Sequence, residues 1–340
     1  MTPTAGGDTV IKPTRRRLRK ASNILAWVTM APVVAVSVFR AVPREWPTLV
    51  VQLVAFTPWL TVPGLLAVVL AVLGRRPQTV IVSAVVLGVQ IFWLFPLEGR
   101  NSSAVRGPTA ELTVMNINSE LGQADPEEIV RLVRDNRVGL LTVQEHTRGL
   151  EARLAAAGLG SLLPNRISHP RDGAGGSAVY SVHPLEEVSL VRGTPFSMPL
   201  VRLKIRDGGR NAVLDLANVH AHAPVDGKGA QWRGDLAAVG RLAARPGHLL
   251  LIGDFNATFD HWEFRKLLDG GAGQRELMDV GALAGARLVP TWPMKGQHLP
   301  GITIDHMVTT PDIGSSGYSV HRVGGTDHAA ITAALAVPAS

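Results

Sequence analysis

Three long apolar runs occupy most of the first hundred residues of the chain. They cover residues 24–42, 49–73 and 79–96, and the second and third runs contain no charged residue. A helix of about 20 apolar residues crosses the roughly 30 Å hydrocarbon core of a bilayer. A soluble core seldom supplies three such runs in succession. The pattern therefore predicts three transmembrane helices rather than the buried helices of a globular domain.

The pattern changes after a polar segment, residues 97–110, which we interpret as a linker. From residue 111 to residue 340, short β-rich runs alternate with loops and a few helical patterns. Helices are expected at 126–136, where Asp125 and Pro126 are typical of a helix N-terminus, and at 232–244. Strands are expected near residues 112–117, 138–145, 176–182, 200–206, 212–219, 249–255, 303–310 and 331–337. Many strands with few crossover helices favour an α/β (α+β) sandwich of two sheets with helices packed outside.

The distribution of charge predicts an orientation for the spans. The whole chain carries a net charge of +7, but residues 1–106 contain 12 Lys and Arg against 3 Asp and Glu, which leaves 22 against 24 for the rest. Basic residues precede the first span, and Arg75 and Arg76 lie between the second and third. Positive loops stay in the cytoplasm. We therefore expect residues 1–23 to be a basic cytoplasmic N-terminus and residues 111–340 to lie outside the cytoplasm, in a multi-pass protein of the cell membrane.

Polar side chains gather where the predicted apolar strands end. A carboxylate at such a point is costly to bury unless a cation or hydrogen bonds compensate. Each residue alone has a structural explanation, such as a turn cap, but six clusters on separate strands favour a shared site. The residues concerned are Asn116, Asn118, Gln144, Glu145, Asn218, His220, His222, Asp254, Asn256, Asp305, His306, Asp327 and His328.

The chemistry of these side chains indicates phosphoester hydrolysis. The chain has no cysteine, which excludes disulfides, thiolate zinc sites, iron–sulfur clusters and cysteine nucleophiles. Carboxylates and amides without thiolates suit a hard cation such as Mg²⁺ or Mn²⁺. Histidines beside carboxylates supply acid–base groups, and the combination can hydrolyse a phosphoester.

The order of short motifs resembles the endonuclease/exonuclease/phosphatase superfamily, which includes deoxyribonucleases, inositol phosphatases and sphingomyelinases. The resemblance covers residues 112–337 and none of the membrane part. The motifs are MNIN, TVQEHT, GGSAVYS, NVHAHAP, IGDFNA, TWP, TIDHMVTT and GTDHAAITA. The resemblance implies a four-layer α/β sandwich and a hydrolase that depends on Mg²⁺ or Mn²⁺.

The resemblance also implies a role for each site residue. On the metal side it places Asn116, Glu145 and Asp327. His220 would contact the scissile phosphate, Asp254 would orient or activate water, and Asn256 would bind phosphate. Asp305 would support His328, which would stabilise the transition state or transfer a proton.

Some residues depart from the pattern or stay open. Thr326 replaces the commoner serine but keeps a hydroxyl. We interpret His222 as a surface histidine rather than a substrate contact, and His146 is ambiguous. Trp292 is either a loop aromatic near the active site or a core residue.

The substrate is constrained less well than the chemistry. An acidic domain with scattered arginines does not favour tracking of a duplex, and Arg202, Lys204, Arg206 and Arg210 are expected on a solvated sheet face. Three spans would hold the site at the membrane surface, which favours lipid-linked or other envelope phosphoesters. The alternatives are a membrane-tethered extracellular nuclease acting on DNA or RNA, and a scaffold that binds phosphorylated ligands without catalysis.

Overall fold

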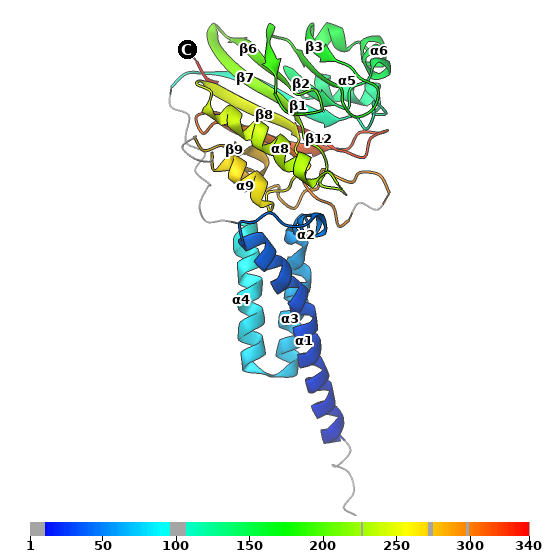
Figure 1. Ribbon diagram of the computed structural model, residues 1–340, viewed down its shortest axis with the longest axis vertical. Helices are drawn as coiled ribbons and strands as arrows, with labels where there is room; N and C mark the ends of the chain where they lie inside the picture. The colour runs from blue at the N-terminus through cyan, green and yellow to red at the C-terminus, as the bar shows by residue number, and fades with distance from the viewer. Residues whose placement is uncertain (1–10, 96–106, 226, 271–274, 297–298, 340) are drawn as a thin grey trace, which may run out of the picture. The chain divides into compact units, whose positions relative to one another are not determined.

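The computed structural model describes residues 11–95, 107–225, 227–270, 275–296 and 299–339 (Figure 1). These residues form two compact units. One contains residues 11–46 and 56–95, and the other contains residues 47–55 and the residues from 107 onward. Residues 1–10 of the predicted N-terminus and residues 97–106 of the predicted linker lie outside the described residues.

The first unit consists of α1 (Ile11–Ala41), the short helix η1 (Thr57–Leu60), α3 (Thr61–Gly74) and α4 (Pro77–Leu94). Three helical stretches are long and apolar enough to cross a membrane. They are Arg15–Ala41, Thr57–Gly74 and Pro77–Leu94. α1 therefore extends the first predicted span at its N-terminal end into the basic segment, and the other two stretches overlap the second and third predicted spans.

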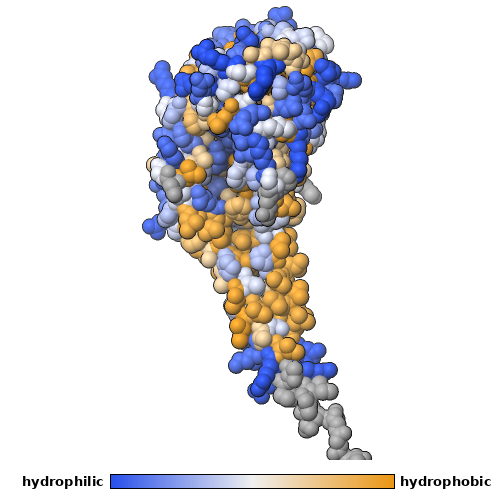
Figure 2. Space-filling model, turned by 90° about the vertical axis from the view of Figure 1, so that its right-hand side faces the viewer, coloured by the Kyte–Doolittle hydropathy of each residue, from blue (hydrophilic) through white to orange (hydrophobic). Residues whose placement is uncertain are grey.

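This unit keeps polar side chains between its helices and apolar side chains outside. Gln90 Nε2 donates to Ser37 Oγ at 2.7 Å, and Thr79 Oγ1 donates to Asn23 Oδ1 at 2.7 Å. Most outward side chains beyond the basic start of α1 are apolar (Figure 2); Leu65, for example, is 56% exposed. Polar side chains that bond between the helices and apolar side chains that face outward suit a hydrocarbon environment. A water-soluble helical bundle has the opposite distribution.

The second apolar run, residues 49–73, is not a single helix. Its first part forms α2 (Thr48–Val54), which belongs to the second unit, and the candidate span begins only at Thr57. Pro58 lies in the first turn of η1. Proline lacks an N–H and is favoured at a helix start, so a new helix begins there.

The second unit contains two six-stranded sheets, which confirms the predicted sandwich. Adjacent strands are antiparallel except in the pairs β1–β2 and β7–β8. In order, the first sheet consists of β11 (Gly314–His321), β12 (Ala330–Pro338), β1 (Thr109–Asn118), β2 (Leu140–Gln144), β4 (Ser177–Ser181) and β3 (Asn165–His169). The second sheet consists of β5 (Leu185–Leu190), β6 (Pro199–Asp207), β7 (Arg210–His220), β8 (His248–Asp254), β10 (Asp305–Thr309) and β9 (Met278–Asp279).

Helices connect and cover these sheets. α5 (Pro126–Asp135), α6 (Arg148–Ala156) and α7 (Leu159–Leu162) pack on the first sheet through a buried apolar cluster. α8 (Gly229–Gly240), η2 (Arg241–Ala244), α9 (Trp262–Leu268) and α10 (Val280–Leu283) belong to the half of the chain that forms the second sheet (Figure 1). Asp125 caps α5 as predicted, because its side chain accepts from the backbone N–H of Glu128 at 3.1 Å. α5 links β1 to the parallel β2, and α8 links β7 to the parallel β8, so these strands end at matching edges.

The face that forms the core between the sheets becomes polar toward one end. In β1, Ala110, Leu112 and Val114 belong to the core, and alternation puts Asn116 and Asn118 on the same face. The same change occurs along β2, β7, β8 and β10. The polar residues that continue the core face are Asn116, Asn118, Thr142, Gln144, Asn218, His220, Asp254 and Asp305, each 3% exposed or less.

Candidate active site

Strand pairing places the central residues of the candidate site in two facing rows. In the second sheet, Asp254 is paired with His220 on one side and with Asp305 on the other. In the first sheet, Asn118 is paired with Gln144. The two rows meet where Asn118 Nδ2 donates to Asp254 Oδ2 at 3.0 Å. Side chains from strands that are far apart in the sequence therefore share one edge of the sandwich.

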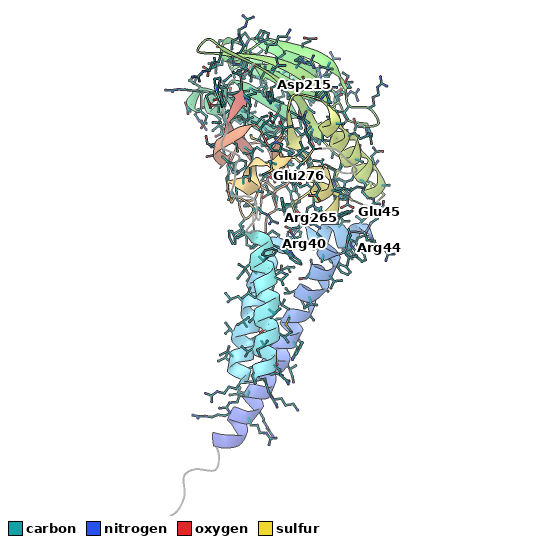
Figure 3. The ribbon with its side chains drawn as sticks, turned by 90° about the vertical axis from the view of Figure 1, so that its left-hand side faces the viewer. Arg40, Arg44, Glu45, Asp215, Arg265 and Glu276 are labelled. Carbon is teal, nitrogen blue, oxygen red and sulfur yellow. The ribbon has the colours of Figure 1, made fainter. Side chains whose placement is uncertain are left out.

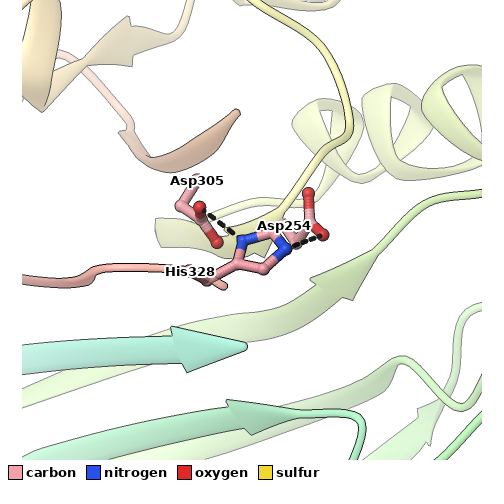
Figure 4. A group of neighbouring side chains, drawn as sticks. All are labelled: Asp254, Asp305 and His328. Carbon is pink, nitrogen blue, oxygen red and sulfur yellow. Dashed lines mark hydrogen bonds and ion pairs between the residues drawn. The ribbon is translucent and has the colours of Figure 1, made fainter. Parts of the chain in front are cut away.

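His328 lies between two buried carboxylates (Figure 4). Its Nδ1 is 3.0 Å from Asp305 Oδ2, and its Nε2 is 3.8 Å from Asp254 Oδ2 and 3.9 Å from Asp327 Oδ1. Thr326 fixes this loop, because its hydroxyl donates to Asn118 O at 2.8 Å and accepts from the backbone N–H of His328 at 3.1 Å. The threonine thus performs a hydroxyl role that the commoner serine could also fill.

The proton affinities of this group follow from burial and charge. Burial lowers the pKa of His328, but Asp305, Asp254 and Asp327 outweigh it and together raise the pKa to about 10. Burial raises the pKa of Asp254 to about 7, with Asp305 adding to the rise and the charge of His328 opposing it. His328 is therefore an imidazolium at neutral pH, and Asp254 is more basic than an ordinary aspartate.

Glu145 follows β2 directly and points into the same region. Its Oε2 accepts from the backbone N–H of Leu121 at 2.6 Å, and its Oε1 lies 3.4 Å from Asn118 Nδ2 and 3.7 Å from His220 Nε2. Burial raises the pKa of Glu145, while the Leu121 and Asn118 hydrogen bonds lower it. The charges of His328 and Asp327 also act on this pKa, so Glu145 is within electrostatic reach of both groups.

Two candidate residues adopt the left-handed backbone conformation. Glu145 has φ of 56° and Asn256 has φ of 47°. A non-glycine residue pays on the order of 1 kcal/mol for this conformation, and such residues cluster at functional sites. Asn256 uses it to turn back on the preceding aspartate: its backbone N–H donates to Asp254 Oδ1 at 2.8 Å. Its side chain donates to Ala221 O at 2.9 Å, which ties the loop after β8 to the loop after β7.

The two asparagines at the end of β1 have different partners. Asn116 Oδ1 accepts from Gln144 Nε2 at 2.6 Å and from Thr142 Oγ1 at 2.8 Å. Among the hydrogen bonds of the described residues, none joins Asn116 to Glu145 or Asp254. Asn118 contacts both carboxylates. The structure thus places Asn118 beside the carboxylates, and Asn116 in the buried network behind them.

Trp292 and Asp327 form the more exposed side of the site. Trp292 Nε1 donates to Asp327 Oδ2 at 2.8 Å, and the Asp327 side chain is 28% exposed. Trp292 is itself half-buried. It is therefore a loop aromatic at the site rather than a core residue, which resolves the alternative left by the sequence.

His222 is not the surface histidine that we expected. Its side chain is 12% exposed, and its Nδ1 lies 3.0 Å from Oδ2 of the buried Asp235. The Phe196 ring stacks on His222 at a centroid distance of 4.0 Å and on His220 at 4.6 Å. Burial, followed by the charges of His328 and His222, lowers the pKa of His220 to about 3, so that imidazole is neutral at pH 7. Sequence reasoning missed Phe196 and Asp235, since neither lies in a recognisable motif.

Two other histidines lie away from this group. Burial lowers the pKa of His146 to about 4, and its Nε2 lies 3.3 Å from the hydroxyl of Tyr180 in the packing of the first sheet. His306 Nδ1 lies 3.0 Å from Asp279 Oδ2, and its ring packs against Phe264. Both histidines are held by structural contacts.

We expect the substitution His222→Ala to weaken substrate binding. It would remove the ring that Phe196 covers and leave the carboxylate of Asp235 with fewer partners, so the wall beside His220 would loosen. The KM should rise about tenfold, equivalent to about 1.4 kcal/mol, with a smaller change in kcat. Steady-state kinetics with the control His169→Ala, a partly exposed histidine paired with Glu187, would check this. A kcat loss as large as that of Asp254→Asn would instead make His222 part of the chemistry.

The donor set fits a divalent cation. Four carboxylates, those of Glu145, Asp254, Asp305 and Asp327, surround a single imidazolium, and burial raises the pKa of two of them. Ligand atoms of Asp254, Asp305 and His328 lie within 4.8 Å of one another. Both ring nitrogens of His328 already face carboxylates, so the triad forms a relay of one hydrogen bond, to Asp305 at 3.0 Å, and one longer ion pair, to Asp254 at 3.8 Å. The remaining negative charge lies on the side of Glu145 and Asp327.

Comparisons with known proteins agree with this fold. A model of the Endonuclease/Exonuclease/phosphatase family matches residues 114–328. An AP endonuclease from Archaeoglobus fulgidus superposes with a TM-score of 0.51 and 15% identity, covering 65% of this chain and 98% of that one. TDP2 from D. rerio, complexed with a single-strand DNA product, gives a TM-score of 0.51 and 12% identity, covering 66% and 98%. A search of curated proteins finds no match. At these identities the structural likeness establishes the shared fold.

Proposed function

This chain belongs to the endonuclease/exonuclease/phosphatase family, and from that premise we propose that it is a membrane-anchored, divalent-metal-dependent phosphoester hydrolase. Its three apolar helices would span the membrane and its second unit would lie outside the cytoplasm. The substrate would be a lipid-linked or other surface phosphoester. The observation that carries the proposal is the buried Asp305–His328–Asp254 relay facing Glu145.

Glu145 and Asp327 would hold the cation, Mg²⁺ or Mn²⁺. Both are carboxylates at the same site, and hydrogen bonds from Asn118 and Trp292 orient them. When bound, such an ion neutralises charge on the phosphoryl oxygens of the substrate. The resemblance placed Asn116 on the metal side. It would act indirectly, by holding Gln144, the residue that precedes Glu145.

The protein's own groups account for the proton transfers. Asp254, with its pKa raised by burial to about 7, would orient the attacking water and accept its proton. His328, held as an imidazolium by Asp305, would stabilise the charge that develops on the phosphoryl group and donate a proton to the leaving-group oxygen as its P–O bond breaks. The neutral His220 would donate a hydrogen bond to a remaining oxygen. Asn256 would donate another with the N–H that in the structure faces Asp254 Oδ2 at 3.2 Å. Burial of these groups strengthens each of these interactions.

Surface charge favours a membrane substrate over a duplex. The basic stretch on β6 is paired within the protein: Arg202 Nε lies 2.8 Å from Asp215 Oδ1, and Lys204 Nζ lies 3.4 Å from Glu186 Oε2 (Figure 3 labels Asp215). Arg210 donates to Thr109 O at 3.0 Å. Nucleic-acid binding depends on basic groups that neutralise phosphates, and these groups already have protein partners.

A substrate panel tests the proposal. The purified full chain in detergent with Mg²⁺ should hydrolyse lipid phosphoesters and small phosphodiesters, and should leave plasmid DNA intact at physiological salt. Intact cells that express the protein should hydrolyse an ester that cannot cross the membrane. Rapid plasmid nicking would favour the nuclease alternative, and the absence of any turnover would favour the binding scaffold. Hydrolysis only after cell lysis would contradict the proposed orientation.

A further inference from the structure

α2 is built into the second unit although it lies between two candidate spans in the sequence. Val51 and Val54 on its inner side are each 4% exposed. The carbonyl oxygen of Val51 lies 2.9 Å from Nε2 of His261, which is 3% exposed. His261 Nδ1 accepts from the backbone N–H of Thr258 at 2.8 Å, so Nε2 carries the proton and donates it to Val51.

α2 contacts both loops that carry site residues, one through the buried Val51 and the other through the exposed Gln52. His261 ends the loop that begins with Asp254 and Asn256 at the end of β8. Gln52 Nε2 donates to Pro224 O at 3.1 Å, in the loop that follows His220 at the end of β7. The two loops are joined to each other by the bond from Asn256 to Ala221 O. α2 thus supports the site at Pro224, four residues beyond His220, and at His261, seven residues beyond Asp254.

Apart from Gln52, the exposed side of α2 is apolar. Leu49 is 67% exposed and Leu53 is 45% exposed, and their i, i+4 spacing puts them on one helical face. In the loop that α2 contacts, Val225 is also 47% exposed. Exposed apolar side chains grouped in this way on a surface favour contact with another apolar phase.

The short connections of α2 to the neighbouring candidate spans indicate that this apolar phase is a lipid bilayer. Six residues separate α2 from the candidate span that ends at Ala41, and two residues separate it from the span that begins at Thr57. Two residues allow Cα atoms at the ends of the connection to be at most about 11 Å apart. If both helices cross a bilayer, α2 cannot leave the vicinity of its surface.

We propose that α2 is an interfacial helix whose Leu49–Leu53 face inserts into the lipid headgroup region while Val51 and Gln52 hold the loops of the active site. The partner is a lipid surface, and the inference rests on the proposed function as a membrane-attached hydrolase. The consequence is that both loops bearing His220 and Asp254 are supported at the bilayer surface. A phosphoester attached to a lipid can then reach the site without leaving the membrane.

Fluorescence tests the lipid contact without relying on activity. The chain has no cysteine, so Leu49→Cys and Leu53→Cys each introduce a single labelling site. We would attach an environment-sensitive dye and reconstitute the full chain in phosphatidylcholine–phosphatidylglycerol vesicles that contain spin-labelled lipids. Quenching should be strong at both positions and weak for Leu190→Cys, an exposed leucine (39%) on β5. Equal weak quenching at all three positions would overturn the proposal.

A matched pair of substrates tests the catalytic consequence. Hexadecyl p-nitrophenyl phosphate in vesicles and ethyl p-nitrophenyl phosphate in solution share the leaving group and differ only in the alkyl chain. Leu49→Ser/Leu53→Ser should lower the rate on the hexadecyl ester about tenfold and leave the rate on the ethyl ester within about twofold. Leu190→Ser should change neither rate.

The two failures can be distinguished. If the wild type hydrolyses neither ester, the proposed function fails, and the quenching result still decides whether α2 lies in lipid. If the double variant loses both rates equally, α2 only supports the fold, and the interfacial role is wrong. An unchanged rate on the hexadecyl ester contradicts the role as well.

Discussion

Replacing Asp254 with asparagine is expected to lower kcat about 10³-fold, with little change in KM. Asp254 lies in the middle of the site: it is paired with His220 and Asp305 across the sheet and lies 3.8 Å from the Nε2 of His328. Asparagine has almost the same shape and can keep the hydrogen bond with Asn256, but it cannot accept a proton from water. The loss should therefore appear in the chemical step rather than in binding.

The fold should survive this change. Burial raises the pKa of Asp254 to about 7, which means that the ionised carboxylate costs stability at pH values above its ordinary pKa. A neutral amide removes that cost, so the unfolding temperature of Asp254→Asn at pH 8 should equal or exceed that of the wild type. Asp215→Asn is the matched control, because Asp215 is also a largely buried aspartate but pairs with Arg202. Full activity in Asp254→Asn, or equal inactivity in the control, would contradict the assigned role.

The sandwich was predictable because apolar residues alternate with other residues along the strands that form its core. Successive residues of β1 point to opposite faces, and the side that carries Leu112 and Val114 continues into Asn116 and Asn118. Polar residues at the ends of apolar strands therefore mark an edge of the sandwich. The alternation does not show which of the polar residues on this face contacts the carboxylates of the site. Asn116 and Asn118 are two residues apart on one face, and only the partner strands decide that Asn118 contacts Glu145 and Asp254.

The second apolar run contains a helix boundary that hydropathy does not show. Residues of α2 are as apolar as those of the following span, so hydropathy joins them into one stretch from 49 to 73. The break depends on contacts with residues such as Pro224 and His261, which are about 170 and 210 positions away in the sequence. An apolar helix that packs on a protein and one that faces lipid have the same composition. Pro58 is a local signal at the position of the break.

His222 was misinterpreted for a related reason. A histidine in a loop after a strand is usually solvated, and the sequence offers no partner nearby. Its buried partner Asp235 is on α8, 13 residues further on, and Phe196 comes from the segment before β6. Asp235 itself lies in an apolar helical pattern, where a carboxylate could have indicated a specific contact. The structure buries it completely.

Removal of divalent metal is expected to abolish hydrolysis, and added Mg²⁺ or Mn²⁺ should restore it. The carboxylates of Glu145, Asp254, Asp305 and Asp327 exceed the charge of the single imidazolium of His328, so the site carries uncompensated negative charge. A cation would relieve this repulsion and should stabilise the fold. In the metal-free protein the unfolding temperature should rise with added Mn²⁺, as expected for a ligand that binds only the folded state.

Glu145→Gln should remove most of this metal response. The amide keeps the size of the side chain and an oxygen that can accept from Leu121 N–H, but it loses the charge that the cation would bind. We expect the rise in unfolding temperature with Mn²⁺ to disappear and kcat/KM to fall about 10³-fold. Glu151→Gln is the control, since Glu151 has similar exposure (20% against 16%) but pairs with Arg166. Because the thermal shift is read without substrate, a metal response that persists in Glu145→Gln would move the cation to other carboxylates even if activity were lost.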